Sequence, residues 1–212
     1  MDDNIQFHNQ MTLKRVAEKL EKNGFKSYVI ESGVKAKEKV LELVGPGESV
    51  GFGGSLTVKQ LGLIDAFSER KQKLFTGKPG LKPEQTLDIR KQALHSDVFI
   101  ASPNALTQDG KLMFWDSIGN RAAGMIFGPK RVIAVAGVNK IVENELAGWQ
   151  RMKTFANPVN AKRLSLQTPC TADGVCHDCD SVQRICNIRV ILDKKPKHTE
   201  YHVILVPECL GY

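Results

Sequence analysis

Hydrophobic residues follow two alternating patterns along this chain, and each pattern predicts a different kind of element. In residues 9–23, Met11, Val16 and Leu20 recur near helical spacing, and a glycine follows as a stop signal. The same reasoning predicts further helices over 36–44, 58–67, 83–94 and 142–155. Short, nearly continuous apolar runs predict strands over 25–30, 49–52, 73–76, 98–101, 125–127, 132–135, 188–192 and 201–206.

The alternation of apolar strands with helices predicts an α/β fold with a mostly parallel sheet and helices on both faces. We expect one domain over residues 1–212, the length of the chain. Residues 168–187 break the rhythm, because they are rich in Cys, Asp, Gly and Thr and poor in large apolar side chains. Since strands are expected on both sides of this segment, we interpret it as a cysteine-rich loop inserted before the chain returns to the sheet.

The charge of the chain changes this picture little. The formal net charge is +7, but Lys and Arg are spread through helical patterns among Glu and Asp, which is typical of a solvated surface. We therefore expect no nucleic-acid partner. No apolar run approaches the length of a membrane span, and the first residues do not resemble a signal peptide. These observations predict a cytoplasmic protein.

A glycine-rich loop follows the predicted strand 49–52. Gly53 and Gly54 let the backbone approach a ligand closely, and Ser55 and Thr57 offer hydroxyl groups where a helix is expected to begin. These four residues are candidates for binding a small anion. The alternative is a structural turn in which Ser55 caps the helix.

Two further predicted strands end in polar residues. Asn104 follows strand 98–101, and Asn139 and Lys140 follow strand 132–135. Lysine can hold an anion or, when desolvated, act as a base or nucleophile, although an exposed lysine in neither role is the commoner case. Because ligands in open α/β sheets bind at the carboxyl ends of strands, the three loops predict a single pocket along one edge of the sheet.

The stretch 112–121 combines an acid, an amide and a guanidinium around a glycine, after an expected hairpin turn at residues 109–110. Arg121 could clamp a carboxylate or phosphate, with Asn120 beside it, and Asp116 is a catalytic candidate together with Lys140. A surface ion pair between Asp116 and Arg121 is the alternative. We expect Trp115 to belong to the core.

Four cysteines crowd into the insertion with the spacing Cys-x5-Cys-x2-Cys-x6-Cys, and these are Cys170, Cys176, Cys179 and Cys186. Four thiolates in one turn-rich segment can bind zinc or an iron–sulfur cluster, and the spacing does not decide between them. Unligated thiols or a redox disulfide remain the alternatives. We expect His177 to be a spectator and Cys209 to be a small buried residue.

Five motifs follow one another along the chain: Gly53-Gly54-Ser55-x-Thr57, Gly119-Asn120-Arg121 before Gly128-Pro129, Gly137-Val138-Asn139-Lys140, the four cysteines, and Leu210-Gly211-Tyr212. In this order the chain resembles the lactate-utilisation (LUD) domain family. The resemblance implies a fold similar to the NagB/RpiA/CoA-transferase group. It also implies a role in oxidising L-lactate to pyruvate beside iron–sulfur partner proteins, and it leaves homo-oligomers open. By motif position it assigns Gly53, Gly54, Ser55 and Thr57 to the anion loop, and Asn104, Asp116, Asn120, Arg121 and Lys140 to the pocket.

Three functions remain open from the sequence. The first is a subunit of a lactate-oxidising or related organic-acid redox system that binds a small anionic metabolite and is not a complete enzyme by itself. The second is a freestanding isomerase or transferase acting on a phosphorylated or CoA-linked small molecule, because fold does not fix function. The third is a noncatalytic ligand-sensing module.

Overall fold

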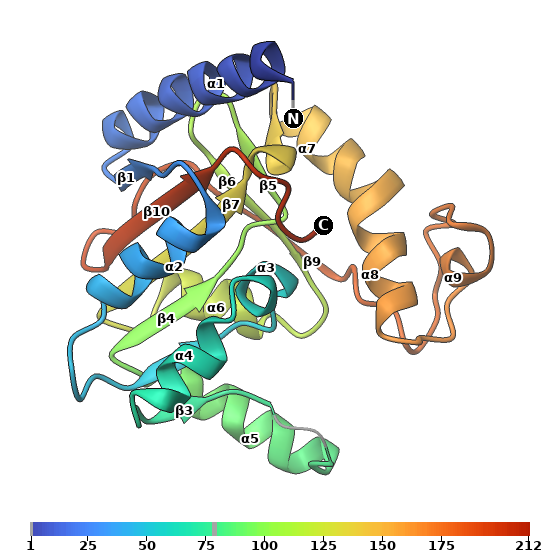
Figure 1. Ribbon diagram of the computed structural model, residues 1–212. Helices are drawn as coiled ribbons and strands as arrows, with labels where there is room; N and C mark the ends of the chain where they lie inside the picture. Colours follow the sequence, from blue (N-terminus) through green and yellow to red (C-terminus); the bar gives the residue numbers. More distant parts are fainter. Residues whose placement is uncertain (1, 78–79) are drawn as a thin grey trace.

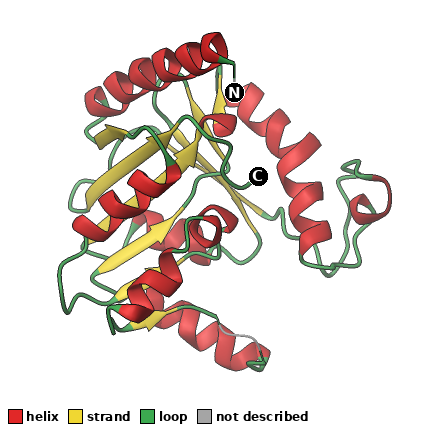
Figure 2. Ribbon diagram, in the orientation of Figure 1, coloured by secondary structure: helices red, strands yellow, loops and turns green. Residues whose placement is uncertain are grey.

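The computed structural model describes residues 2–77 and 80–212 and confirms the α/β architecture (Figures 1 and 2). Six parallel strands form the central sheet in the order β1-β10-β7-β4-β2-β3. They are β1 (Lys26–Val29), β2 (Val50–Phe52), β3 (Leu74–Phe75), β4 (Val98–Ala101), β7 (Arg131–Gly137) and β10 (Glu200–Val206). The sheet buries side chains on both faces, as near-continuous apolar strands require.

Alternate residues of each central strand face opposite layers of helices. Phe99 and Val132 pack into a cluster with α1, α5 and α6, whereas Ile100 and Ile133 pack into a second cluster with α2, α3 and α4. The helices are α1 (Asp3–Lys22), α2 (Gly33–Glu42), α3 (Leu56–Gln60), α4 (Leu63–Glu69), α5 (Pro83–Ala93) and α6 (Asn120–Ile126). The prediction of helices on both faces is therefore confirmed.

A second, four-stranded sheet was not predicted from the sequence. Its order is β8-β5-β6-β9, with antiparallel β5–β6 and β6–β9 pairs. The strands are β5 (Ala105–Thr107), β6 (Leu112–Asp116), β8 (Ile141–Val142) and β9 (Ile188–Leu192). The expected turn at residues 109–110 joins β5 to β6, and Gly110 has a φ of 84°. After the cysteine-rich segment the chain thus pairs first with β6 and reaches the central sheet only at β10.

Two other predictions about elements were wrong. Residues 125–127 are not a strand, because Met125 and Ile126 close α6 and Phe127 is an exposed cap residue. The predicted helix 58–67 is two helices, α3 and α4, separated at Gly62, which adopts a left-handed conformation with φ 61°. In the first case a three-residue apolar run carried no periodicity that could distinguish helix from strand.

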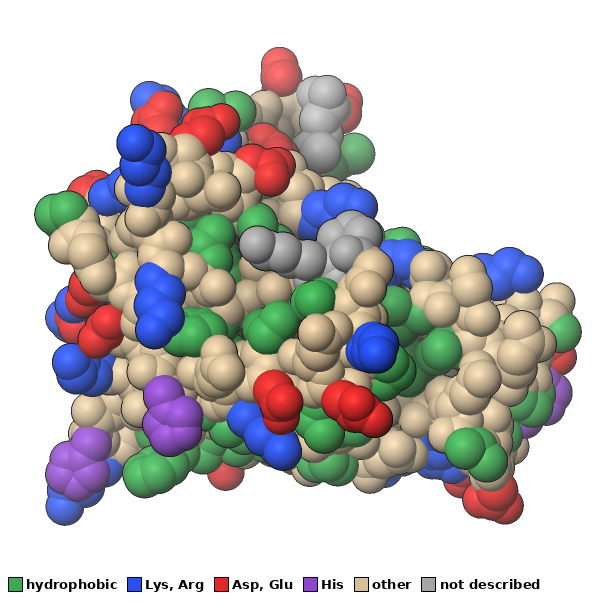
Figure 3. Space-filling model, turned by 90° about the horizontal axis from the view of Figure 1, so that it is seen from below, with side chains coloured by type: hydrophobic (Ala, Val, Ile, Leu, Met, Phe, Trp, Pro, Cys, Tyr) green, Lys and Arg blue, Asp and Glu red, His purple; other side chains and the backbone are tan. Residues whose placement is uncertain are grey.

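A helical arm follows the second sheet. It runs through a 3-10 turn (Val138–Lys140), α7 (Glu145–Arg151), a π-helical segment (Met152–Ala156) and α8 (Asn157–Arg163), and the cysteine-rich segment with α9 (Cys170–Asp173) projects beyond it (Figure 1). Figure 3 shows acidic and basic side chains interspersed on the lower face of the molecule. In the described part of the chain, no helix combines the length and apolar character needed to cross a membrane.

Candidate functional site

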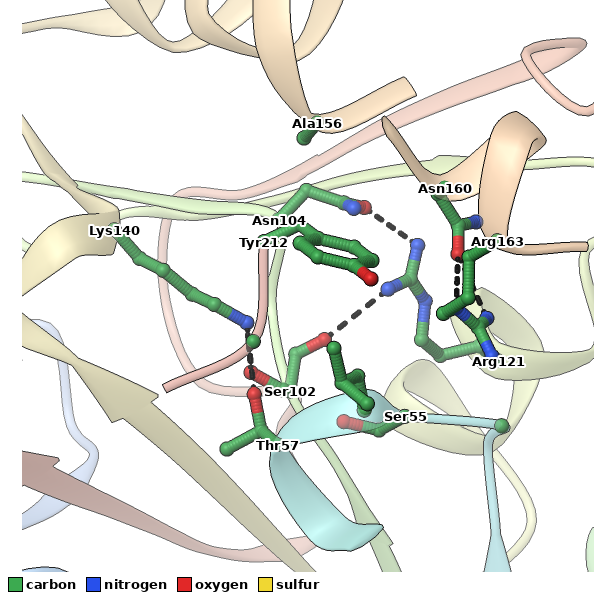
Figure 4. Close-up of a pocket in the computed structure, with 13 residues that line it drawn as sticks. Ser55, Thr57, Ser102, Asn104, Arg121, Lys140, Ala156, Asn160, Arg163 and Tyr212 are labelled. Carbon is green, nitrogen blue, oxygen red and sulfur yellow. Dashed lines mark hydrogen bonds between the residues drawn. The ribbon is translucent and has the colours of Figure 1, made fainter. Parts of the chain in front are cut away.

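The carboxyl ends of three neighbouring strands meet at one edge of the central sheet. β7, β4 and β2 are adjacent, so the loops at Lys140, Ser102 and Thr57 lie side by side (Figure 4). The Lys140 Nζ donates to Ser102 Oγ at 2.6 Å and to Thr57 Oγ1 at 3.0 Å. The structure therefore brings together the three polar strand ends that the sequence singled out.

Lys140 is buried, with 3% of its surface exposed. Burial holds the pKa of its amine well below the ordinary 10.5, and the nearby charges of Arg151 and Arg121 lower that pKa further. Within the described residues its side-chain partners are two hydroxyl groups, and it forms no ion pair with a carboxylate. This amine is a buried cation without a counter-charge, or a neutral base when deprotonated.

Arg121 is fixed by a dense set of acceptors. Its Nε donates to Asp116 Oδ1 at 2.9 Å, and its terminal nitrogens contact Asp116, Asn104 Oδ1 and the carbonyl oxygens of Ser102 and Trp115. The second oxygen of Asp116 accepts the backbone N–H at the start of α6 at 2.7 Å. Both oxygens of Asp116 are thus engaged, which makes it a positioning residue for Arg121 and not a free general base.

Arg151 supplies a third basic side chain, half-buried, from α7. Its Nε donates to the Asn139 carbonyl at 3.0 Å and its terminal nitrogen donates to the Asn104 carbonyl at 2.8 Å. Burial lowers the pKa of this guanidinium. Three basic side chains therefore surround the strand ends, and Asp116 is the single carboxylate bonded to any of them among the described residues.

Two adjoining cavities open at this edge of the sheet. The inner one is about 50 Å³ and reaches Lys140, and the outer one is about 430 Å³ and extends past Arg121. We call their union the anion cleft. Five basic residues line it, whereas Asp116 is the one acidic residue in its lining within the described part of the chain. The basic ones are Lys59, Arg90, Arg121, Lys140 and Arg163.

The glycine loop lies against Arg121. A Cβ on Gly53 would approach the Arg121 Cγ to 2.9 Å, so glycine is needed for this contact. Gly54 has a φ of 66°, and a Cβ at this position would meet no heavy atom within 4 Å. Gly54 lines both cavities of the cleft. Ser55 Oγ accepts the Val58 N–H at 3.3 Å and so caps α3, as the alternative interpretation held, while Ser55 also lines the cleft.

The predicted site residues separate into two groups. Those that line the cleft are Gly53, Gly54, Ser55, Thr57, Asn104, Asp116, Asn120, Arg121 and Lys140. Asn139 does not, because its side chain accepts the Leu210 N–H at 3.0 Å and donates to the Gly211 carbonyl at 3.1 Å. It therefore holds the segment 210–212 against the inner cavity. The interpretation of the Asp116–Arg121 pair as a surface contact is wrong, since the two side chains are 6% and 14% exposed.

Several lining residues were missed from the sequence. Ser102 lies one residue beyond β4 and could have been included from its position alone. Asn160 and Arg163 come from the helical arm, and no local pattern distinguishes them from surface residues. Arg151, from the same arm, contacts the Asn104 carbonyl without lining the cleft. Tyr212 lies between Lys140 and Arg121 in Figure 4. Its segment carried part of the family resemblance but gave no indication of a pocket.

The four cysteines of the insertion line one further cavity of about 20 Å³, against α8. Burial raises the pKa of the Cys186 thiol; the charge of Arg184 opposes this shift, and the other three cysteines add to it. In the part of the chain that the structure describes, no three His, Cys, Asp or Glu side chains are placed to hold a metal ion. His177 Nε2 is 2.7 Å from Asp173 Oδ2. Cys209 is exposed, so the prediction that it is buried was wrong.

The fold and site define a class, an α/β protein with a basic pocket at the carboxyl ends of three adjacent parallel strands. Residues 13–206 match the LUD domain, and the chain belongs to this family, which is associated with lactate utilisation proteins. Among solved structures it is similar to a DUF162 family protein from Deinococcus radiodurans. The two share 12% sequence identity with a TM-score of 0.55, over 93% of this chain and 98% of that chain. At this identity the likeness shows the fold alone. No curated protein matches.

Proposed function

We propose that this protein binds a small organic anion in the anion cleft, as one subunit of a lactate-utilisation or related organic-acid redox system that converts L-lactate to pyruvate. The observation that carries the proposal is the unbalanced buried charge. Three buried or half-buried basic side chains lie near the strand ends, and these are Lys140, Arg121 and Arg151. In the described residues, Asp116 is the one carboxylate paired with any of them. Burying a cation without a counter-charge costs several kcal/mol, which a bound anion would offset.

The geometry indicates how a carboxylate would be held. Arg121 lies in the wall shared by the inner and outer cavities, where the second N–H of its Nη1, beyond the bond to the Ser102 carbonyl, can donate to a carboxylate oxygen. The backbone of Gly54 and the Lys140 amine flank the same inner space. A ligand with a carboxylate beside a hydroxyl or keto group matches this arrangement, because the second oxygen can face the Lys140 amine.

Lys140 is the residue best suited to chemistry on such a ligand. A desolvated amine with a lowered pKa gives up its proton more readily than an exposed lysine, and the neutral amine can then accept a proton. Asp116 supports the reaction by orienting Arg121. The electrons of a lactate oxidation would pass to partner proteins, so we expect the isolated chain to lack the full activity.

Reconstitution tests this function. The full chain is combined with the iron–sulfur proteins of the lactate-utilisation system of the same cell, and L-lactate-dependent reduction of an artificial electron acceptor is followed. We expect reduction only when chain and partners are both present, and at least a tenfold loss with Lys140→Met. The exposed Lys91→Met is the matched control and should retain the activity. Full activity of the chain alone, or none in the complete mixture, contradicts the proposal.

A second candidate function is favoured by the buried amine itself. A desolvated lysine beside hydroxyl groups also suits a freestanding isomerase or transferase that acts on a phosphorylated or CoA-linked molecule. Turnover of such a substrate by the isolated chain, lost in Lys140→Met and retained in Lys91→Met, would select this candidate over the subunit.

A further inference from the structure

The cysteine-rich segment 168–187 holds its shape with little apolar packing of its own. Val175 and Val182 are exposed, and α9 is four residues long. The side chain of Arg184 instead fastens the segment, donating to the Cys179 carbonyl at 2.6 Å and to the Cys186 carbonyl at 3.1 Å. A segment of this composition needs an additional cross-link to be stable.

All four cysteines of the segment line one cavity, whose exposed lining is almost wholly apolar. Four thiolates bound to one zinc ion lie about 2.3 Å from it, hence about 3.8 Å from one another, and leave no space between them. Here the four cysteines line a cavity of about 20 Å³, which leaves space for about one water molecule between the side chains that enclose it. No three of them are placed as a single ion requires, within the described residues.

We infer that the four cysteines bind an iron–sulfur cluster of the [4Fe–4S] type, in which each thiolate has its own iron atom and the thiolates lie farther apart than around a single ion. Each of Cys170, Cys176, Cys179 and Cys186 would ligate one iron atom. Arg184 would partly balance the negative charge of the thiolates from its place against two of the ligand carbonyls. His177 takes no part, since its Nε2 is engaged with Asp173.

The cluster would lie directly beside the anion cleft. Asn157 at the start of α8 and Ile185 in the cysteine-rich segment line both the cysteine cavity and the outer part of the cleft. These two side chains form the wall between the two sites. The inference stands on the cysteine geometry and does not depend on the ligand or activity of the cleft.

Anaerobic reconstitution tests the cluster. The full chain is purified without oxygen, incubated with ferrous iron and sulfide, desalted, and analysed for iron, acid-labile sulfide and zinc. We expect about four iron and four sulfide ions per chain, with a brown absorbance that dithionite bleaches. Cys176→Ser and Cys186→Ser should each lose at least half of the iron. Cys209→Ser, which alters an exposed cysteine outside the segment, should retain it.

X-ray absorption at the iron edge of the wild-type chain gives a readout that does not depend on folding of the variants. Sulfur ligation together with iron–iron scattering is expected. Stoichiometric zinc that excludes iron, a disulfide among the four cysteines that persists under reductant, or a chain that takes up no iron would each overturn the inference.

Discussion

Replacing Lys140 by methionine is expected to stabilise the protein while weakening its binding of anions. The side chain is 3% exposed, and burial lowers its pKa well below 10.5. Each unit by which a lysine pKa is lowered in the folded state represents ~1.4 kcal/mol of destabilisation below that folded pKa. Methionine has a similar volume and carries no charge, so Lys140→Met removes this cost.

The cost of the lost hydrogen bonds is smaller. Thr57 Oγ1 still donates to the Leu210 carbonyl and Ser102 Oγ to the Pro103 carbonyl, so each hydroxyl loses one incoming bond. Two such losses cost about 2 kcal/mol together. Against a desolvation penalty of several kcal/mol, the net gain in the free energy of unfolding is ~1–3 kcal/mol, or roughly 2–10 °C in Tm for a chain of this size.

The pH dependence of stability provides the assay. Because the pKa of Lys140 is lowered in the folded state, the unfolded state binds more protons between the folded pKa and 10.5. Wild-type stability therefore rises with pH through this window. Urea unfolding from pH 6 to 10.5 should show that Lys140→Met lacks this rise and that its advantage disappears near pH 10.5. A variant less stable than wild type at pH 7, with the pH dependence unchanged, would refute the reasoning.

Three further results are expected. Asp116→Ala should lower the free energy of unfolding by ~3–5 kcal/mol in urea denaturation, because it leaves Arg121 buried without its carboxylate. Gly53→Ala should cost ~1–3 kcal/mol and weaken anion binding in calorimetry, since its Cβ displaces Arg121, whereas Gly54→Ala should cost only the ~1–2 kcal/mol of left-handed strain. The hydrogen bond from Lys26 is the main cause that lowers the pKa of Glu200 to about 2. The free energy of unfolding should therefore fall as pH falls from 4.5 towards 2. The same pH dependence of stability in Glu200→Gln would count against this.

Much of the central sheet was predictable because its strands are buried on both faces. Strands such as Val98–Ala101 are continuous apolar runs, which short-range patterns reveal. The second sheet was not predictable in this way, because β6 pairs with β9 some 75 residues later and that pairing depends on the whole fold. Gly62 shows the same limit on a smaller scale, since a single glycine ended α3 inside an otherwise helical pattern.

The site followed from a general rule of parallel sheets and not from any motif alone. Lys140, Thr57 and Asn104 were accessible to sequence reasoning because carboxyl ends of adjacent strands share an edge. Arg163 was not, since it reaches the cleft through the packing of a helical arm, and neither was Arg151, which holds the Asn104 loop from the same arm. The burial that changes the chemistry of Lys140 was also invisible in the sequence, where an exposed lysine is the commoner case.

Isothermal titration calorimetry at pH 7 tests the central claim, that the buried cations of the cleft bind a small organic anion. L-lactate, pyruvate and inorganic phosphate are titrated in turn into wild type, Lys140→Met and the exposed control Lys91→Met. The account predicts one site per chain for at least one of these anions, at least tenfold weaker in Lys140→Met and unchanged in the control. Binding of equal strength in Lys140→Met and wild type, or no binding of any of the three anions to wild type, would contradict it.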